Sequence, residues 1–459
     1  MHLPKRAARA TLAVFAAIIV AGISQLTGAP QHQKTTPEYG IRDKSTTLTA
    51  FTHATIVVSP TVTYEDATLL IRDGKIAAVG KSVTIPADAE IVDLKDKFIY
   101  PAFIEPYSEY GLERAPGGRP DRGGGPQYEG RRVGVDSWND AVRPELNLVN
   151  EFKPDDDAAG NLIEAGYAIA QSCRMDGVFR GRGFVALLNS GLPNDQILVA
   201  RTGQFLSFNK GSSRQEYPSS QMGSIALIRQ TLMDADWYAK AQESLRRNPA
   251  QAQIETNLSL AALAEIRNDP VVFDPEDEVS LLRADKIAKE FGLKQIYLGN
   301  GFEYSVAAAI KATGASLILP VNFPKAPYVK SAEDALDVSL ADLRHWEMAP
   351  SNLSILEKNQ IEFAVTSTKL KDPGQVLVNL RKAIKRGLTK QTALAALTTI
   401  PAKLTGVANR AGTLESGKLA NFIIAGSEIF DEDFAIQSVW IAGTKHRVEE
   451  PPDFDIRGN

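Results

Sequence analysis

Short apolar runs alternate along the middle of the chain with stretches in which apolar residues recur at helical spacing. The short runs occupy residues 183–188, 271–273, 316–319 and 363–365, and the helical stretches include residues 225–237, 376–384 and 393–397. Short apolar runs that alternate with helices are typical of βαβ units with a parallel sheet. The region from about Phe98 to about Gly406 spans about 300 residues, which suits an α/β fold of the (β/α)8 TIM-barrel type with an insertion.

The two ends of this region show β-type patterns instead. Upstream of Leu94, strand-like runs are broken by turn residues, and the clearest turn is Asp73-Gly74. Because a type I′ turn needs positive φ at both central positions, Asp-Gly between two such runs predicts a hairpin. Residues 420–425 and 438–442 are again short β-type runs near the other end. Two β segments therefore bracket the predicted barrel.

Polar capping residues mark several helix ends. Ser219 or Ser220 is suited to cap the helix that runs toward residue 237, because a serine hydroxyl accepts a hydrogen bond from a free N–H of the first turn. Gly387 is expected to end one helix, and Thr389 to cap the next.

The first 29 residues have the pattern of a secretory signal peptide. Lys5, Arg6 and Arg9 precede an apolar run at residues 12–23, and small residues follow it. This run of 12 residues is shorter than the roughly 20 needed to cross a bilayer, so no stable membrane span is predicted. We therefore expect a cleaved signal peptide, a polar linker at residues 30–45, and a periplasmic or secreted protein.

Composition and charge exclude some classes of function. The chain has 51 Lys and Arg against 55 Asp and Glu, a net charge of -4, so it lacks the electrostatic attraction that phosphate backbones exert on basic proteins. Cys173 is the only cysteine, which excludes an intramolecular disulfide and a CxxC zinc or redox site. We expect no nucleic-acid partner.

A segment rich in glycine and arginine interrupts the pattern at residues 113–132. Ordering so many glycines is entropically costly, so we expect a mobile insertion. Either this insertion is a solvated loop, or its arginines form a basic lid over an anionic ligand, since it directly follows the first expected barrel strand.

Two motifs resemble the amidohydrolase superfamily, and in particular its imidazolonepropionase-like members. Tyr100-Pro-Ala-Phe-Ile-Glu-Pro-Tyr-Ser-Glu109 is similar to the family's first barrel strand, Pro-Gly-Phe-Ile-Asp-x-His-x-His. The segment ALAALTTIPAKLTGVANRAGTLESGKLANFII, at residues 393–424, is similar to the family's closing block, which leads from a helix back into a small β domain. The resemblance implies a TIM-like barrel at residues 99–408, a β-sandwich assembled from residues 46–98 and 409–446, and a tail or linker at residues 447–459.

The resemblance also implies a metal site, with histidines on barrel strands 1, 5 and 6 and an aspartate on strand 8. The positions on strands 1, 5 and 8 fall here on Tyr107, Glu109, Asp274 and Ser367, and the strand 6 region contains no histidine. Only one of the five histidines, His345, lies within the expected barrel, and one histidine cannot build the family's binuclear zinc centre. Glu109 and Asp274 are left as candidate metal ligands, and Ser367 as the candidate catalytic residue.

Three hypotheses from different classes follow. The first is a pseudoenzyme, an exported amidohydrolase-like barrel without its own metal cofactor, which acts as the non-catalytic partner or half of a hydrolase of amide or peptide-like C–N bonds, beside a histidine-bearing half or subunit. The second is an active amidohydrolase in which the carboxylates of Glu109 and Asp274 bind Mg²⁺, Mn²⁺ or Zn²⁺. The third is a periplasmic module that binds a small molecule or peptide without turnover, with Tyr107, Glu109, Asp274 and Ser367 as binding residues.

Each candidate residue also has a structural explanation. Tyr107 and Glu109 can simply fill the cavity in which the family binds its metal. Glu109 would then pair with an arginine, because a buried carboxylate is stable only when its charge is paired. Asp274 precedes a proline and an acidic run, so a turn or helix-cap role fits it equally well. Ser367 has no identifiable histidine base, which favours a loop hydroxyl over a nucleophile.

Overall fold

The computed structural model describes residues 48–113, 127–132, 134–250 and 253–447. The predicted signal peptide at residues 1–29 and the linker at 30–45 lie outside these ranges, as do residues 114–126 of the predicted insertion and residues 448–459 of the tail. Within the described ranges, no helix has both the length and the apolar character that a membrane crossing requires.

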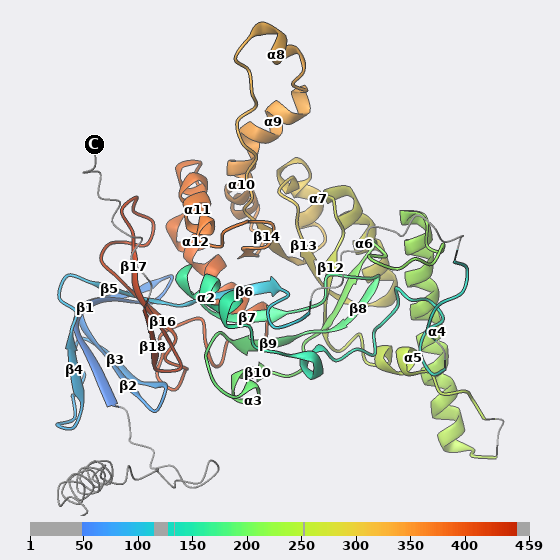
Figure 1. Cartoon of the computed structure of the whole chain (residues 1–459), viewed down its shortest axis with the longest axis horizontal. Helices are drawn as coiled ribbons and strands as arrows, with labels where there is room; N and C mark the ends of the chain where they lie inside the picture. Colours follow the sequence, from blue (N-terminus) through green and yellow to red (C-terminus); the bar gives the residue numbers. More distant parts are fainter. Residues whose placement is uncertain (1–47, 114–126, 133, 251–252, 448–459) are drawn as a thin grey trace, which may run out of the picture. The chain divides into compact units, whose positions relative to one another are not determined.

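Strands from both ends of the described chain form one eight-stranded sheet (Figure 1). Its members are β1 (Leu48–Ser59), β2 (Val62–Arg72), β3 (Lys75–Gly80), β4 (Glu90–Asp93), β5 (Phe98–Pro101), β16 (Phe422–Ala425), β17 (Ile436–Ile441) and β18 (Thr444–Arg447). The order is β18-β17-β16-β5-β1-β2-β3, and β4 pairs with β1. The antiparallel pair β5–β16 joins the two ends, with Ile99 opposite Ile424. The predicted small β-sandwich assembled from both terminal segments is confirmed.

The Asp73-Gly74 turn connects β2 and β3, as the sequence predicts. Both residues have positive φ, 51° at Asp73 and 76° at Gly74, which is the backbone conformation of a type I′ turn. A Cβ at position 74 would lie 2.6 Å from the carbonyl oxygen of Ala442. Glycine is therefore required here both by the turn and by the close approach of the C-terminal segment.

Ten further strands build the TIM-like barrel and its surroundings. They are β6 (Phe103–Ser108), β7 (Tyr167–Ser172), β8 (Phe179–Arg182), β9 (Phe184–Leu187), β10 (Ile197–Val199), β11 (Gln204–Ser207), β12 (Pro270–Asp274), β13 (Lys294–Leu298), β14 (Ser316–Pro320) and β15 (Phe363–Thr366). One ladder runs β10-β9-β7-β6 and the other runs β15-β14-β13-β12-β11-β8. Strands β11 to β15 are parallel neighbours, as the alternating pattern predicts.

One barrel segment departs from the expected parallel arrangement. Residues 179–187 form β8 and β9, which run antiparallel to β11 and to β7 respectively, so this segment links the two ladders. The two strands meet at Gly183, where a Cβ would lie 2.5 Å from the carbonyl oxygen of Ser172. Glycine at this position lets the segment pass close to the end of β7 while it changes partner.

Helices separate and cover the barrel strands. They are α2 (Asp156–Glu164), α3 (Pro193–Gln196), α4 (Gln221–Arg247), α5 (Leu258–Leu263), α6 (Glu278–Phe291), α7 (Ala307–Lys311), α8 (Ala332–Leu336), α9 (Leu340–Met348), α10 (Asn352–Lys358), α11 (Gln375–Lys385), α12 (Lys390–Leu397) and α13 (Thr399–Leu404), with short 3-10 turns η1 (Leu148–Glu151), η2 (Glu303–Ser305) and η3 (Ala349–Ser351). Ser220 caps α4 by accepting from the N–H of Gly223, and Thr389 caps α12 by accepting from the N–H of Thr392. Both predicted caps are confirmed.

Candidate functional site

Apolar side chains fill the interior of the barrel. One buried cluster gathers residues from β6, β11, β12, β13, β14 and the loop after β7, namely Tyr107, Cys173, Phe205, Val272, Ile296, Leu298 and Ile318. Burial raises the pKa of the Cys173 thiol well above its usual value, so the thiol stays protonated and packs as a small apolar group. The space inside the strands is therefore a packed core at this level.

Arg180, on β8, lies at the edge of this core with its charge directed inward. Its side chain is only 4% exposed. Nη1 donates to the Tyr107 hydroxyl at 2.9 Å and pairs with Asp274 Oδ2 at 3.1 Å. Burial alone would lower the pKa of the guanidinium, but Tyr107, Asp274 and Cys173 raise it overall, so Arg180 stays charged. The structure thus joins two of the residues singled out in the sequence, Tyr107 and Asp274, through an arginine.

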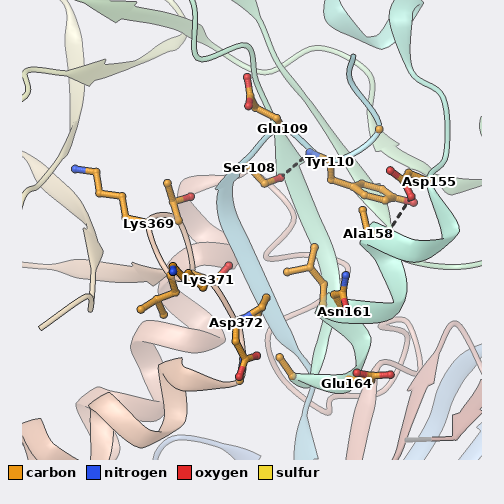
Figure 2. A pocket seen from close by; sticks show the side chains of 18 of the residues that line it. Ser108, Glu109, Tyr110, Asp155, Ala158, Asn161, Glu164, Lys369, Lys371 and Asp372 are labelled. Carbon is orange, nitrogen blue, oxygen red and sulfur yellow. Dashed lines mark hydrogen bonds between the residues drawn. The ribbon is translucent and has the colours of Figure 1, made fainter. Parts of the chain in front are cut away.

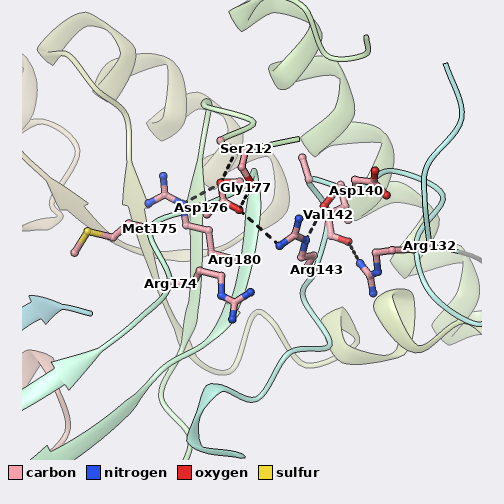
Figure 3. A network of polar contacts seen from close by, with 12 residues as sticks. Arg132, Asp140, Val142, Arg143, Arg174, Met175, Asp176, Gly177, Arg180 and Ser212 are labelled. Atoms are coloured by element: carbon pink, nitrogen blue, oxygen red, sulfur yellow. Dashed lines mark hydrogen bonds and ion pairs between the residues drawn. The ribbon is translucent and has the colours of Figure 1, made fainter. Parts of the chain in front are cut away.

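The loop before β8 fixes the guanidinium from a further direction. The carbonyl of Gly177 accepts from Arg180 Nε at 3.0 Å. The neighbouring Asp176 accepts from the Ser212 N–H at 2.5 Å and from its hydroxyl at 2.8 Å, and it pairs with Arg143 at 3.6 Å (Figure 3). Asp176 thus anchors the loop, and the carbonyl of Gly177 in the same loop holds the Arg180 guanidinium in place.

The other two predicted residues lie apart from Arg180's hydrogen bonds. Glu109 is half-buried, and its Oε1 accepts from the N–H of Met175 at 3.2 Å. Among the described residues no arginine forms an ion pair with Glu109, whereas Arg180 pairs with Asp274, because β8 and β12 both flank β11 and bring those two side chains together. Ser367 donates its hydroxyl to Glu105 at 2.6 Å, which supports the structural explanation for this serine.

Glu105, on β6, is fully buried and connects the first and last barrel strands. Its carboxylate accepts from the N–H of Tyr107 at 3.1 Å, from the N–H of Ser367 at 2.8 Å, and from the hydroxyls of Thr366 and Ser367. Burial raises the pKa of Glu105, and these hydrogen bonds oppose the rise. No backbone ladder joins β6 and β15 among the described strands, so these bonds of Glu105 are a direct link between the two ladders.

The metal that the family resemblance implies does not fit this set of residues. The ligand positions on strands 1 and 5 contain a phenol and a carboxylate that are both bonded to a guanidinium. In the described part of the chain, no three His, Cys, Asp or Glu side chains are grouped so that they could hold a metal ion. A divalent cation 4 Å from the Arg180 charge would be repelled by about 8 kcal/mol at an effective dielectric constant of about 20. The guanidinium therefore competes with a metal for the same carboxylate.

A large groove opens beside this centre. It has a volume of about 1030 Å³ and lies between α2 and the loop that follows β15 (Figure 2). Lys369 and Lys371 line one side, and Glu109 and Asp155 line the opposite side. The groove can therefore offer positive and negative charge to the two ends of a zwitterion.

Comparisons with known proteins agree with this architecture. The model of the amidohydrolase family matches residues 356–445. This segment of the chain therefore has the sequence pattern of the amidohydrolase family. An amidohydrolase crystal structure from Thermotoga maritima MSB8 is similar over 87% of this chain and 99% of its own, with 22% identity and a TM-score of 0.69. A second amidohydrolase crystal structure is similar over 88% of this chain and 100% of its own, with 13% identity and a TM-score of 0.50.

At these identities the similarity establishes the amidohydrolase fold, a TIM-like barrel with a β-sandwich. No curated protein sequence matches this amidohydrolase-fold chain. The sequence motifs did not point to two residues of the site, Arg180 and Glu105. A usable signal was present, because Arg180 and Arg182 alternate within an apolar strand-like stretch, and alternation places two charges on one face of a strand.

Proposed function

We propose that this chain is an exported, non-catalytic amidohydrolase-fold protein that acts as the partner, or as one half, of a hydrolase of C–N bonds in amides or peptides. The observation that carries the proposal is the guanidinium of Arg180 between Tyr107 and Asp274, at positions where the resemblance places metal ligands. A guanidinium supplies positive charge to the barrel centre, but it does not generate hydroxide from water as a bound zinc ion does.

The bonding of Tyr107, Ser367 and Glu105 supports the same proposal. Tyr107 is buried, and burial raises the pKa of its phenol well above the ordinary value, so it does not accept a proton near neutral pH. Ser367 is hydrogen-bonded to Glu105, and the Glu105 carboxylate accepts four hydrogen bonds in all, from Tyr107, Thr366 and Ser367. Export rests on the sequence pattern of the first 29 residues.

Hydrolysis assays test the non-catalytic role. The purified chain is incubated with N-acyl amino acids, dipeptides and cyclic amides in the presence of Zn²⁺, Mg²⁺ or Mn²⁺, beside the variants Glu109→Ala and Asp274→Ala. We expect no product above the protein-free blank in any combination. Metal-stimulated turnover that disappears in both variants would instead establish an active enzyme with a carboxylate metal site.

The partner role has its own test. Chemical crosslinking of the exported protein fraction, followed by mass spectrometry, is expected to join this chain to an amidohydrolase barrel with an intact His-x-His strand. Hydrolysis by that subunit is then measured with and without the chain. An unchanged rate and an absence of crosslinks to such a subunit would contradict the partner role.

The groove between α2 and the loop after β15 favours a second candidate, a module that binds a small zwitterion or short peptide. Lys369 and Lys371 suit a carboxylate, and Glu109 and Asp155 suit an amine. Dipeptides at millimolar concentration are then expected to raise the unfolding temperature of the chain without being cleaved. The double variant K369E/K371E should lose that shift, whereas K382E, on α11 and outside the groove lining, should keep it.

A further inference from the structure

A second cavity lies against the two helices that follow β14, and it shares no lining residue with the groove described above. It has a volume of about 470 Å³, and its walls come from α8, α9 and the segment at residues 324–328. These two helices extend outward from the barrel (Figure 1). A cavity of this size can hold a small organic molecule, and the chemistry of its lining indicates which kind.

Three carboxylates line this cavity. Asp334 lies on α8, Asp337 follows at the C-terminal end of α8, and Asp342 lies in the first turn of α9. Asp334 and Asp342 each use one oxygen to accept a hydrogen bond from the serine that caps their own helix. Within the described ranges, none of the three carboxylates forms an ion pair with a lysine or an arginine. Their negative charge is therefore available to a ligand.

At neutral pH the lining holds two more negative charges than positive ones. Lys325 lines the same cavity and offsets one of the three carboxylates. His345 also lines it, but burial lowers the pKa of its imidazole more than nearby carboxylates raise it, so this ring is uncharged at neutral pH. A ligand with two positive charges therefore fits the charge of the cavity better than a neutral or anionic one.

Aromatic rings give the cavity a second kind of surface that attracts cations. Tyr328 is 65% exposed and Trp346 is 40% exposed. The ammonium group of Lys330, which is outside the lining, lies 5.3 Å from the centre of the Tyr328 ring, a distance at which a ring face attracts a cation. Among the described side chains, no lysine or arginine lies over the indole of Trp346, the ring type that binds cations best. A ligand ammonium can therefore use Trp346 directly and compete with Lys330 at Tyr328.

Apolar side chains complete the lining. Pro324, Pro327 and Val338 contribute them, and methylene groups gain free energy when such side chains remove them from water. We propose that this cavity binds a linear aliphatic diamine, with its two ammonium groups at the carboxylates and aromatic rings and its methylene chain against the prolines and the valine. Each class of lining residue then has a counterpart in the ligand.

Calorimetric titration of the full chain with three ligands of similar length tests the proposal. The probes are 1,4-diaminobutane, n-butylamine and 1,4-butanediol, which carry two, one and no positive charges near neutral pH. We expect the diamine to bind at one site with a dissociation constant below about 1 mM, the monoamine to bind about fivefold more weakly, and the diol not to bind. Added salt should weaken binding of the diamine, because Asp337 and Asp342 are exposed and their charges are screened.

Three variants and a matched control locate the site. Asp337→Asn removes a charge from a side chain that makes no hydrogen bond within the described ranges, so it should weaken diamine binding about threefold without disturbing a helix cap. Trp346→Leu removes the indole but keeps an apolar side chain, and it should weaken binding about threefold. Lys330→Met removes the competing ammonium and should tighten binding about twofold. Glu65→Gln removes one exposed charge on β2 and should leave binding unchanged.

The tighter binding expected for Lys330→Met separates the proposal from a loss of folding, because a variant that fails to fold cannot bind more tightly than the wild type. Equal binding of the diamine and the diol, no binding of the diamine up to about 10 mM, or equal effects of Asp337→Asn and Glu65→Gln would each overturn the proposal. None of these results depends on whether the chain hydrolyses amides.

Discussion

Replacing Arg180 by methionine removes the cation from the barrel centre and leaves an unbranched side chain in its place. The Arg180 side chain is 4% exposed and that of Asp274 is 22% exposed, so R180M leaves a mostly buried carboxylate without its partner. Breaking a buried ion pair in this way costs about 3–5 kcal/mol. Because Asp274 keeps some contact with solvent, we expect a loss of about 3 kcal/mol for R180M. Asp274→Asn leaves the more deeply buried charge unpaired and should cost about 4 kcal/mol.

The double variant R180M/D274N separates the ion pair from other effects of the two substitutions. With both charges gone, it should lose about 2 kcal/mol less than the two single variants together. Urea unfolding at pH 7, followed by tryptophan fluorescence and circular dichroism, provides the free energies. Arg182→Met is the matched control, since Arg182 is equally buried on the same strand but pairs with Asp269. Purely additive losses for R180M and D274N, or equal coupling of R182M with D274N, would refute the assignment of this pair as the central charge contact.

Three further predictions concern the rest of the fold. Burial raises the pKa of Glu105 above its ordinary 4.5, so wild-type stability should fall as pH rises from about 4.5 through that raised value, and Glu105→Gln should remove this fall. Urea unfolding midpoints between pH 4.5 and 8 measure the effect. Midpoints that fall equally with pH in the wild type and in Glu105→Gln would contradict it. Gly74→Ala should cost about 1–3 kcal/mol, because φ is positive there and a Cβ would meet the carbonyl of Ala442; an unchanged melting temperature would show that the hairpin adapts. Ser220→Ala should cost about 1 kcal/mol through loss of the bond to the Gly223 N–H, whereas Ser220→Asp, which keeps an acceptor, should not.

Local patterns predicted much of the architecture because they depend on nearby residues. Asp73-Gly74 predicts a hairpin because these residue types tolerate the positive φ that a type I′ turn needs. Ser220 and Thr389 predict helix starts because their hydroxyls can accept a hydrogen bond from a free N–H of the first turn. The direction of the segment at residues 179–187 was beyond such patterns, since an apolar run indicates a strand but not whether it runs parallel to its neighbours.

The candidate site was predictable only in part, for the same physical reason. The motif positions pointed to Tyr107 and Asp274, and the structure brings both to one guanidinium. The pairing of Arg180 with Asp274 was not accessible, because the two residues are 94 positions apart and meet only through the strand order of the barrel. The bonds from Ser367 to Glu105 likewise span 262 positions and form only because β6 and β15 lie side by side in the fold.

The pairing of β5 with β16 constrains how the chain reaches its native state. β5 is made early, yet Ile99 finds its neighbour Ile424 only after the whole barrel has been synthesised. Until then one edge of β5, Phe98–Pro101, has no strand beside it, and an open apolar edge invites pairing with other chains. Contacts between such distant positions also form slowly, because a long loop must close before they stabilise anything. The time at which β16 is synthesised therefore determines how long this early strand is exposed to aggregation.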